Sequence, residues 1–200
     1  MDFQIYKVGI TGNIGSGKST VCRIFETLKI PVYYSDNKAK ELIHTNPVII
    51  SAYKQFLGND IYNKGQLDKK RVSETLFKQK ELLKEIEAVV HPAVVEDFRQ
   101  WTCKQQSPFV LYESAIIFES GYYDLLDKII FVSAPENLQV KRIMKRDGVS
   151  KENVYARIDN QWKEEKKIPL SDYVITCDDV NPLIPQVLEL YNIIMKLQTK

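Results

Sequence analysis

An eight-residue segment near the start of the chain constrains this protein more than any other part of its sequence. Residues 12–19 read Gly-Asn-Ile-Gly-Ser-Gly-Lys-Ser, which fits the pattern G-x-x-x-x-G-K-[ST] of a phosphate-binding loop. Glycines let such a loop turn so that successive backbone N–H groups point inward at phosphate oxygens. In this pattern the lysine, here Lys18, reaches the β- and γ-phosphates, and the serine hydroxyl, here Ser19, can bind Mg²⁺. The residues expected to bind the nucleotide are Gly12, Asn13, Ile14, Gly15, Ser16, Gly17, Lys18, Ser19 and Thr20.

The residues on either side of this loop distinguish it from an ordinary glycine-rich turn. Residues 5–10 before it form an apolar-rich run of strand length, and the apolar residues after it recur at helical spacing. A helix that begins at the loop adds the positive end of its dipole to the anion site. A strand, a loop and a helix in this order predict that the ligand is a nucleotide.

Composition places the chain among globular proteins and argues against several classes of partner. With 200 residues, of which 44% are hydrophobic, the chain can bury the core of one α/β domain with insertions. Its 28 Lys and Arg against 26 Asp and Glu leave a net charge of +2, which gives no support to a nucleic-acid or membrane partner. We therefore expect small-molecule partners and a monomer or a small homo-oligomer.

Cysteine usage and hydropathy favour a cytoplasmic protein. Cys22, Cys103 and Cys177 are scattered and form no C-x-x-C pair, so neither a disulfide framework nor a zinc site is indicated. The sequence enters the first expected strand without a cleavable leader, and no apolar run approaches the ~20 residues of a membrane span.

Short apolar runs alternate with longer helical patterns, which predicts an α/β fold with a parallel sheet of about five strands flanked by helices. The expected strands cover residues 5–10, 31–34, 108–112, 128–132 and 173–176.

Three regions follow from this pattern. The nucleotide-binding core is expected to take residues 1–36, 107–135 and 168–200. Residues 37–106 form a mostly helical insertion with a turn at residues 63–65, and residues 136–167 form a pair of basic helices. The second of these helices is expected to begin at a Ser150 cap and to run past Trp162.

Two acidic residues follow expected strands at the edge of the sheet where the strands have their carboxyl ends, which is where open parallel sheets bind ligands. Asp36 comes just after the second strand, where its carboxylate can accept a proton from an acceptor hydroxyl or orient that hydroxyl; the alternative is a helix cap. Glu113 follows the third strand and can hold Mg²⁺ or its waters, with a plain surface carboxylate as the alternative. Glu119 could take the place of Glu113.

Basic residues gather on the first helix of residues 136–167. Arg142 and Arg146 are four residues apart and therefore project from one face, beside Lys141 and Lys145. Helices of this kind close as lids over a nucleotide, supply charge and exclude water. Together with the phosphate loop the pattern favours a lid over a solvated charged face, and Arg157 in the next helix is a lesser candidate for the same role.

His91 stands before Pro92 after a long apolar-periodic pattern, and it is one of only two histidines. His-Pro in this position more often marks the end of a helix than a catalytic group. We therefore expect a helix terminus here.

The order of these motifs resembles dephospho-coenzyme A kinase over nearly the whole chain. T-G-N-I-G-S-G-K-S-T and V-Y-Y-S-D look like that family's phosphate loop and its V-I-D-A-D segment, whose second aspartate falls on Asp36. Leu67-Asp68, Leu76-Phe77 and Val90-His91-Pro92 are similar to the family's acceptor-binding insertion. E-S-A-I-I-F-E at residues 113–119 resembles its D-V-P-L-L-F-E stretch, and residues 142–147 resemble its lid.

This resemblance implies a kinase of the P-loop fold that uses ATP and Mg²⁺ to phosphorylate the ribose 3′-hydroxyl of dephospho-coenzyme A. It implies catalytic roles for Asp36, Lys18, Arg142 and Arg146, with Asp36 as base or orienter. The implied substrate contacts are Asp36, Lys69, His91 and Glu113, and the implied metal ligand is Ser19.

The chain departs from the family pattern at three positions. Tyr34 replaces the first aspartate of the pair, Ala115 replaces a proline, and Lys69 stands where the family tends to place arginine. Lysine keeps the charge of arginine but loses its fork geometry. The substrate contact that the resemblance implies at Lys69 therefore depends on its charge alone.

Two other functions fit a phosphate loop. A guanine-reading switch protein needs N-K-x-D and D-x-x-G motifs, and neither occurs in this sequence. A nucleoside or nucleotide kinase with a different small acceptor would need nearly the same sequence features, so this alternative stays open.

Overall fold

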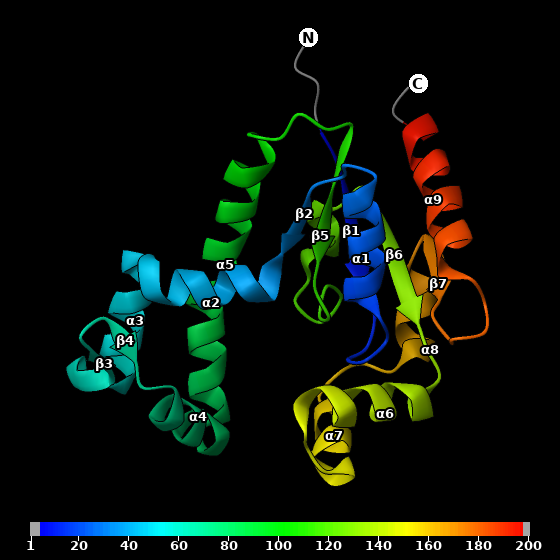
Figure 1. Cartoon of the computed structure of the whole chain (residues 1–200). Helices are drawn as coiled ribbons and strands as arrows, with labels where there is room; N and C mark the ends of the chain where they lie inside the picture. The colour runs from blue at the N-terminus through cyan, green and yellow to red at the C-terminus, as the bar shows by residue number, and fades with distance from the viewer. Residues whose placement is uncertain (1–4, 198–200) are drawn as a thin grey trace. The chain divides into compact units, whose positions relative to one another are not determined.

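The structure, a computed structural model, describes residues 5–197, without the side chains of residues 77, 78 and 80. The chain forms two compact units (Figure 1). The first unit takes the chain up to Tyr34 and again from Gln105, and the second unit is Ser35–Lys104.

The first unit is built on a five-stranded sheet with the order β2-β5-β1-β6-β7, in which each neighbouring pair is parallel. Its strands are β1 (Tyr6–Thr11), β2 (Val32–Tyr34), β5 (Phe109–Glu113), β6 (Lys128–Ser133) and β7 (Tyr173–Thr176). The chain order reverses next to the central strand β1, which is the position where open α/β sheets bind ligands. The parallel sheet with flanking helices that the sequence predicts is confirmed.

The helices of the first unit follow the expected order with one difference. They are α1 (Lys18–Thr27), α6 (Glu136–Asp147), α7 (Lys151–Ile158), α8 (Glu164–Lys167) and α9 (Leu183–Leu197), with 3₁₀ turns η2 (Tyr122–Leu125) and η3 (Ile168–Leu170). Ser150 caps α7 as expected, because its side chain accepts a hydrogen bond from the N–H of Asn153. The prediction that this helix continues past Trp162 is wrong: the N–H of Trp162 donates to the Glu119 carboxylate at 2.9 Å instead of to a helical carbonyl.

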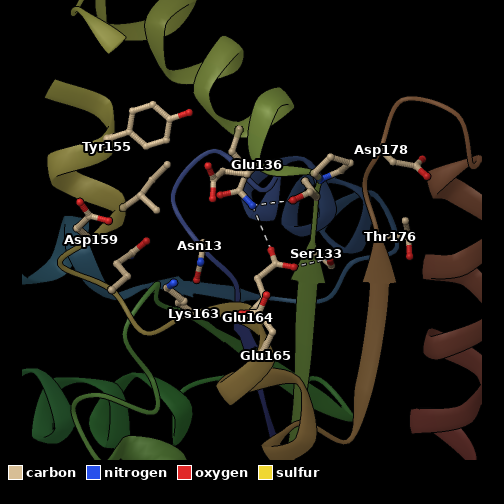
Figure 2. A pocket seen from close by; sticks show the side chains of 15 residues that line it. Asn13, Ser133, Glu136, Tyr155, Asp159, Lys163, Glu164, Glu165, Thr176 and Asp178 are labelled. Atoms are coloured by element: carbon tan, nitrogen blue, oxygen red, sulfur yellow. Dashed lines mark hydrogen bonds between the residues drawn. The ribbon is translucent and has the colours of Figure 1, made fainter. Parts of the chain in front are cut away.

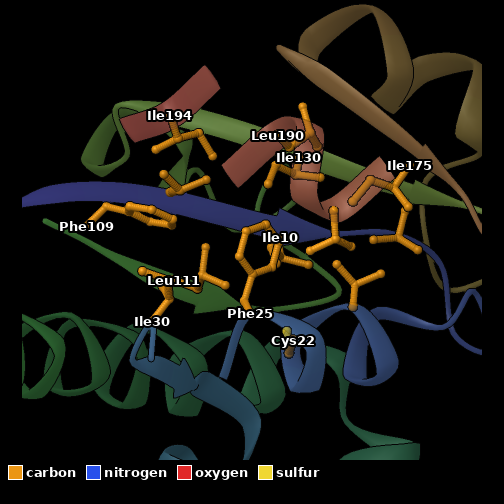
Figure 3. Packing of buried hydrophobic residues seen from close by; sticks show 14 of the residues in the cluster. Ile10, Cys22, Phe25, Ile30, Phe109, Leu111, Ile130, Ile175, Leu190 and Ile194 are labelled. Carbon is orange, nitrogen blue, oxygen red and sulfur yellow. The ribbon is translucent and has the colours of Figure 1, made fainter. Parts of the chain in front are cut away.

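The core of the first unit lies between one face of the sheet and helices α1 and α9 (Figure 3). Side chains alternate between the two faces along each strand, and Val8, Ile10 and Ile130 on this face are fully buried. Phe25 of α1 meets Phe109 edge to face, with ring centroids 6.2 Å apart. This packing holds β1 and α1, and therefore both ends of the phosphate loop between them.

The second unit is mostly helical, as expected for the insertion. It contains α2 (Ser35–Thr45), α3 (Pro47–Leu57), η1 (Asn59–Ile61), β3 (Tyr62–Asn63), β4 (Gln66–Leu67), α4 (Lys69–Lys78) and α5 (Lys80–Thr102). The side chain of Asn46 caps α3 by accepting the N–H groups of Val48 and Ile49 at 2.9 and 3.2 Å. Between β3 and β4 the chain turns at Lys64 and Gly65, with φ of 47° and 78°, at the position the sequence predicts.

Asp36 lies inside a helix and does not cap one. Helix α2 begins at Ser35, so the Asp36 carboxylate belongs to its first turn and is exposed. A negative charge at this position interacts favourably with the helix dipole. The interpretation of Asp36 as a helix cap is therefore wrong, and its carboxylate is not bound up in capping.

His91 and Pro92 also lie inside a helix, so the expected helix terminus at this point is wrong. Helix α5 runs from Lys80 to Thr102 with Pro92 in its interior, although an interior proline costs about 3 kcal/mol. A stripe of buried residues spaced by four continues on both sides of the proline and outweighs this cost: Ile86, Val90, Val94 and Phe98. Even with this 23-residue helix, no helix within residues 5–197 is long and apolar enough to cross a bilayer.

Candidate functional site

The phosphate loop connects the end of β1 to the start of α1 and depends on its glycines. Gly12, Gly15 and Gly17 have φ of 147°, 81° and 103°, conformations that residues with a side chain rarely adopt. A Cβ on Gly12 would clash with the carbonyl oxygen of Val132, and one on Gly15 would come 2.7 Å from the carbonyl oxygen of Gln139. The loop is therefore a tight backbone turn enclosed by β6 and α6.

Lys18 folds back over the loop that precedes it. Its ammonium donates hydrogen bonds to the carbonyl oxygens of Gly12 at 2.8 Å and Asn13 at 3.3 Å, and the residue is 8% exposed. The positive charge is thus fixed beside the loop's own backbone, and its contact with the β- and γ-phosphates stays a prediction.

Several polar atoms in the loop and at the end of β1 are buried without a hydrogen-bond partner among the described residues. Among the described residues, Thr11 Oγ1, Asn13 Oδ1 and Ser16 Oγ lack a hydrogen-bond partner although each atom is buried. An unsatisfied buried polar group costs about 1–3 kcal/mol. Such groups are expected where a polar ligand or a water molecule completes their hydrogen bonding.

Glu113 lies at the same edge of the sheet as the loop. It is the last residue of β5 and pairs in register with Tyr34 of β2 on one side and Ile10 of β1 on the other. Only 9% of Glu113 is exposed. The structure thus places this carboxylate next to the strand that leads into the loop, as the sequence predicts.

Arg142 contacts the loop from outside. One guanidinium nitrogen of Arg142 donates to the carbonyl oxygens of Gly15 and Ser16, both at 3.3 Å. The other donates to the carbonyl oxygen of Cys177 at 3.0 Å and pairs with Asp179 at 2.6 Å. Arg142 therefore ties the loop to the residues that follow β7, a contact that its spacing in the sequence does not reveal.

Arg146 has different partners. Its guanidinium binds both carboxylate oxygens of Asp147, at 2.7 and 3.0 Å, and Asp147 also pairs with Arg157 at 2.6 Å. Hydrogen bonds from Arg146 and Arg157 lower the pKa of Asp147 to about 2. The two arginines expected to act together on one face thus hold different groups in this structure.

Glu119 binds within the protein through one carboxylate oxygen, while its Oε2 is buried without a hydrogen-bond partner among the described residues. The alternative that Glu119 organises the metal stays a prediction. The Oε1 of Glu119 pairs with Lys167 at 2.6 Å and accepts the N–H of Trp162 at 2.9 Å. Lys167 is 0% exposed and also donates to the carbonyl oxygen of Ala115 at 3.1 Å. Nothing in the sequence signals this pair, because Lys167 looks like an ordinary surface residue of a short charged helix.

Replacing Lys167 with methionine is expected to lower the free energy of unfolding by about 3–5 kcal/mol, because it leaves the Glu119 carboxylate buried without its counter-charge. Denaturant unfolding measures this change, with Lys163→Met at an exposed lysine of the same segment as control. The double variant Glu119→Gln/Lys167→Met is expected to lose less free energy of unfolding than the two single variants lose in sum. Equal, small losses of stability in Lys167→Met and Lys163→Met would contradict a stabilising role for the pair of Lys167 and Glu119.

A cavity of about 570 Å³ lies beside the loop, between the ends of β6 and β7 and helices α6 to α8 (Figure 2). On its wall Glu164 accepts hydrogen bonds from Ser133 at 2.8 Å and Gln139 at 3.1 Å, and burial raises the pKa of Glu164. Carboxylates dominate the lining beside one lysine, Lys163: Glu136, Asp159, Glu164, Glu165 and Asp178. This acidic lining does not suit a triphosphate, so the loop amides and Lys18 remain the expected anion site.

Three of the predicted site residues belong to the second unit. Asp36 is exposed in the first turn of α2, and Lys69 is exposed at the first position of α4, directly after the Asp68 cap. His91 is half-buried in α5, and burial lowers its pKa. The structure describes these residues within their own unit, so their approach to the phosphate loop stays a prediction.

Comparison with known proteins agrees with the phosphate loop in indicating a kinase. The family model described as CoaE, dephospho-CoA kinase, matches residues 6–181. Similar curated proteins are dephospho-CoA kinases of Bacteroides fragilis, 40% identical over 92% of this chain and 90% of that protein, and of Porphyromonas gingivalis, 40% identical over 92% and 91%.

Solved structures give the same family and fold. The chain is similar to a dephospho-CoA kinase from Campylobacter jejuni, with a TM-score of 0.69, 28% identity, and 95% of this chain and 97% of that chain covered. A shikimate kinase from Acinetobacter baumannii, 15% identical with a TM-score of 0.55 over 99% and 97% of the two chains, is similar in fold alone. The fold is thus that of the P-loop kinases, and the chain belongs to the dephospho-CoA kinase family.

Proposed function

We propose that this protein transfers the γ-phosphate of ATP to the ribose 3′-hydroxyl of dephospho-coenzyme A, which gives coenzyme A in the last step of its biosynthesis. The observation that carries this proposal is the phosphate loop between β1 and α1, with Lys18 held against its backbone, in a chain of this family. Phosphoryl transfer needs little covalent chemistry from the protein; it needs aligned phosphates, neutralised charge and an acceptor hydroxyl in line.

The loop supplies the nucleotide site in this proposal. Backbone N–H groups of residues 12–20, other than that of Ile14, which donates to Gln161, hold the β- and γ-phosphates together with the dipole of α1. The Lys18 ammonium neutralises the charge that develops during transfer. Three glycines in conformations that side chains disfavour support this role, since they let the backbone approach the phosphates closely.

Mg²⁺ fits the oxygen groups at this edge of the sheet. The Ser19 hydroxyl is exposed in the first turn of α1, and Glu113 lies at the end of β5. Within the described part of the chain no three His, Cys, Asp or Glu side chains gather as a metal cage. That agrees with Mg²⁺, which proteins usually bind through one or two side chains together with phosphates and waters. When bound, it would neutralise phosphate charge.

Asp36 is the proposed base or orienter for the 3′-hydroxyl. It follows β2 by two residues, and the last residue of β2, Tyr34, pairs with Glu113 at the edge where the strands have their carboxyl ends. Its exposed carboxylate is free of a capping role and can accept a hydrogen bond from an incoming hydroxyl. Lys69 and His91 of the same unit are the proposed contacts for the remainder of dephospho-coenzyme A.

Residues 136–167 are the proposed lid, next to a core of residues 1–36, 107–135 and 168–200 and an acceptor-binding insertion of residues 37–106. Arg142 stays on the loop backbone, where it shapes the cradle. The side chain of Arg146 is 61% exposed, and Asp147 also pairs with Arg157 at 2.6 Å, so Asp147 keeps a partner when Arg146 turns to a phosphate.

Replacing Arg146 with alanine is expected to lower kcat about 10- to 100-fold and to raise the share of ATP that is hydrolysed without transfer, because the lid loses a phosphate contact and admits water. The ratio of ADP to coenzyme A formed measures this share. Lys145→Ala, at an exposed neighbouring position, is the control. An unaltered ratio in Arg146→Ala would count against the lid.

The proposed partners are ATP and dephospho-coenzyme A alone, with no nucleic acid and no membrane, and the proposed location is the cytoplasm. The net charge of +2 supports the absence of nucleic-acid and membrane partners, since it offers no strong field for polyanions. A monomer or a small homo-oligomer is sufficient, because each proposed role falls on this one chain.

The proposal is tested by incubating the protein with Mg·ATP and a panel of acceptors: dephospho-coenzyme A, free nucleosides and nucleoside monophosphates. We expect dephospho-coenzyme A to give the highest kcat/KM, and removal of Mg²⁺ with EDTA to abolish turnover. Phosphorylation of a different nucleoside in place of dephospho-coenzyme A would instead identify another P-loop kinase. Slow ATP hydrolysis with every acceptor would favour a nucleotide-driven switch.

A further inference from the structure

The third residue of the phosphate loop has a partner far along the chain. The backbone N–H of Ile14 donates to the side-chain Oε1 of Gln161 at 2.9 Å, across 147 residues of sequence. This N–H therefore points away from the phosphate cradle and toward the segment that follows α7, which we call the return segment (residues 159–167).

The side chain of Ile14 is held from the same side. It packs against a small buried cluster of α6 and α7 formed by Val140, Ile143 and Val154. Ile14 is thus fixed twice, by apolar packing of its side chain and by a hydrogen bond of its backbone. The two anchors together leave the loop little freedom at this residue.

The return segment is the end of the proposed lid region, and in this structure it is attached to the core, so Gln161 extends from a fixed base. Directly after Gln161, the N–H of Trp162 donates to Glu119 at 2.9 Å. Further on, Glu164 accepts hydrogen bonds from Ser133 and Gln139, and the fully buried Lys167 pairs with Glu119. These contacts tie the segment to the ends of β5 and β6 and to α6. A side chain on such a base can set the position of a flexible partner.

The partner of Gln161 needs such support. A loop with glycines at positions 12, 15 and 17 has much conformational entropy to lose when it closes around phosphates. A hydrogen bond that already holds the loop before the nucleotide arrives lowers this cost, and the gain appears as nucleotide affinity.

We propose that Gln161 is a positioning residue for ATP, which holds the phosphate loop in its binding conformation through the N–H of Ile14 without touching the nucleotide. The proposal rests on the proposed function only in taking ATP as the ligand of the loop. The effect assigned to Gln161 is specific. The affinity for ATP depends on the side-chain oxygen of Gln161, and the affinity for dephospho-coenzyme A does not.

The test uses two changes at this position in the full chain. Gln161→Met keeps the length of the side chain and removes the acceptor, and Gln161→Asn keeps the amide but shortens its reach by one methylene. Asn160→Ala is the matched control, because the exposed Asn160 amide bonds only to the neighbouring carbonyl oxygen of Ala156 among the described residues. Binding of a non-hydrolysable ATP analogue and the KM values for both substrates are measured for each variant.

Both Gln161 variants are expected to weaken ATP binding and raise the KM for ATP about three- to tenfold, the loss of one hydrogen bond, while the KM for dephospho-coenzyme A stays within twofold. Hydrogen exchange of the Ile14 amide, measured without nucleotide, is expected to quicken in both variants and to stay slow in Asn160→Ala. A destabilised fold would instead speed exchange throughout the core and change both KM values.

Unchanged ATP affinity, or unchanged exchange at Ile14, in Gln161→Met and Gln161→Asn would overturn the proposal. An equal rise in both KM values would also overturn it and leave Gln161 a general structural role. These outcomes are separate from the proposed function: if the parent protein binds ATP but does not phosphorylate dephospho-coenzyme A, the function fails while the ATP-binding results still decide the role of Gln161.

Discussion

Replacing Lys18 with alanine is expected to lower kcat/KM for ATP by at least about 100-fold, because it removes the cation that neutralises the β- and γ-phosphates in a desolvated loop. Lys18 is 8% exposed and is held by the carbonyl oxygens of Gly12 and Asn13, which fix its charge beside the loop. Binding of a non-hydrolysable ATP analogue by calorimetry, together with steady-state kinetics, measures the effect.

The matched control is Arg23→Ala, which removes a cation from the exposed face of the same helix α1. It is expected to change ATP affinity less than twofold. Thermal unfolding of both variants shows whether the loop change disturbs the fold. If Lys18→Ala binds ATP as tightly as the parent protein while it remains folded, the loop is not the nucleotide site.

Replacing Asp36 with asparagine is expected to lower kcat about 100- to 10,000-fold and to leave ATP affinity within twofold, because it removes the proposed base without changing the phosphate loop. Asparagine keeps the size of the side chain and can still orient a hydroxyl, but it cannot accept its proton. Single-turnover kinetics with saturating ATP and dephospho-coenzyme A separate this chemical step from binding.

The control for this change is Glu41→Gln on the same helix α2. The exposed Glu41 carboxylate pairs only with the nearby Lys38 among the described residues, and no role in the reaction is proposed for it. Its kcat is expected to stay close to that of the parent protein. Equal turnover of Asp36→Asn and the parent would dismiss Asp36 as base, and a parallel loss of ATP binding would indicate a different role for it.

The sheet and the phosphate loop could be predicted from the sequence because their signals are local. The loop pattern occupies eight consecutive residues, and a strand and a helix follow from the apolar residues directly on either side. The position of Glu113 beside the loop was also predictable, because the carboxyl ends of parallel strands meet at one edge.

Helix boundaries were harder to predict from the sequence where tertiary contacts outweigh local helix preference. Pro92 predicts a helix end, but a buried stripe that continues through α5 keeps the helix intact. In the opposite sense, the helical pattern past Ile158 fails because Gln161 and Trp162 bond to the distant residues Ile14 and Glu119. Neither outcome is contained in the spacing of apolar residues alone.

The supporting contacts of the site were not predictable at all. The bond from Ile14 to Gln161, the buried pair of Glu119 and Lys167, and the contact of Arg142 with the loop join residues that are 147, 48 and more than 100 positions apart. Single residues of common polar types carry no pattern that signals such partners. The roles of Asp36, Lys69 and His91 still depend on the resemblance, because these residues belong to the second unit.

A crystal structure with a non-hydrolysable ATP analogue, Mg²⁺ and dephospho-coenzyme A bound together would show directly whether the phosphate loop and Asp36 bring the two substrates together. We expect the β- and γ-phosphates in the loop of residues 12–19 with Lys18 on the γ-phosphate, and the ribose 3′-oxygen in line with the γ-phosphorus and within hydrogen-bond distance of Asp36. An empty loop with the nucleotide bound elsewhere, or a 3′-oxygen remote from both the γ-phosphate and Asp36, would contradict the account.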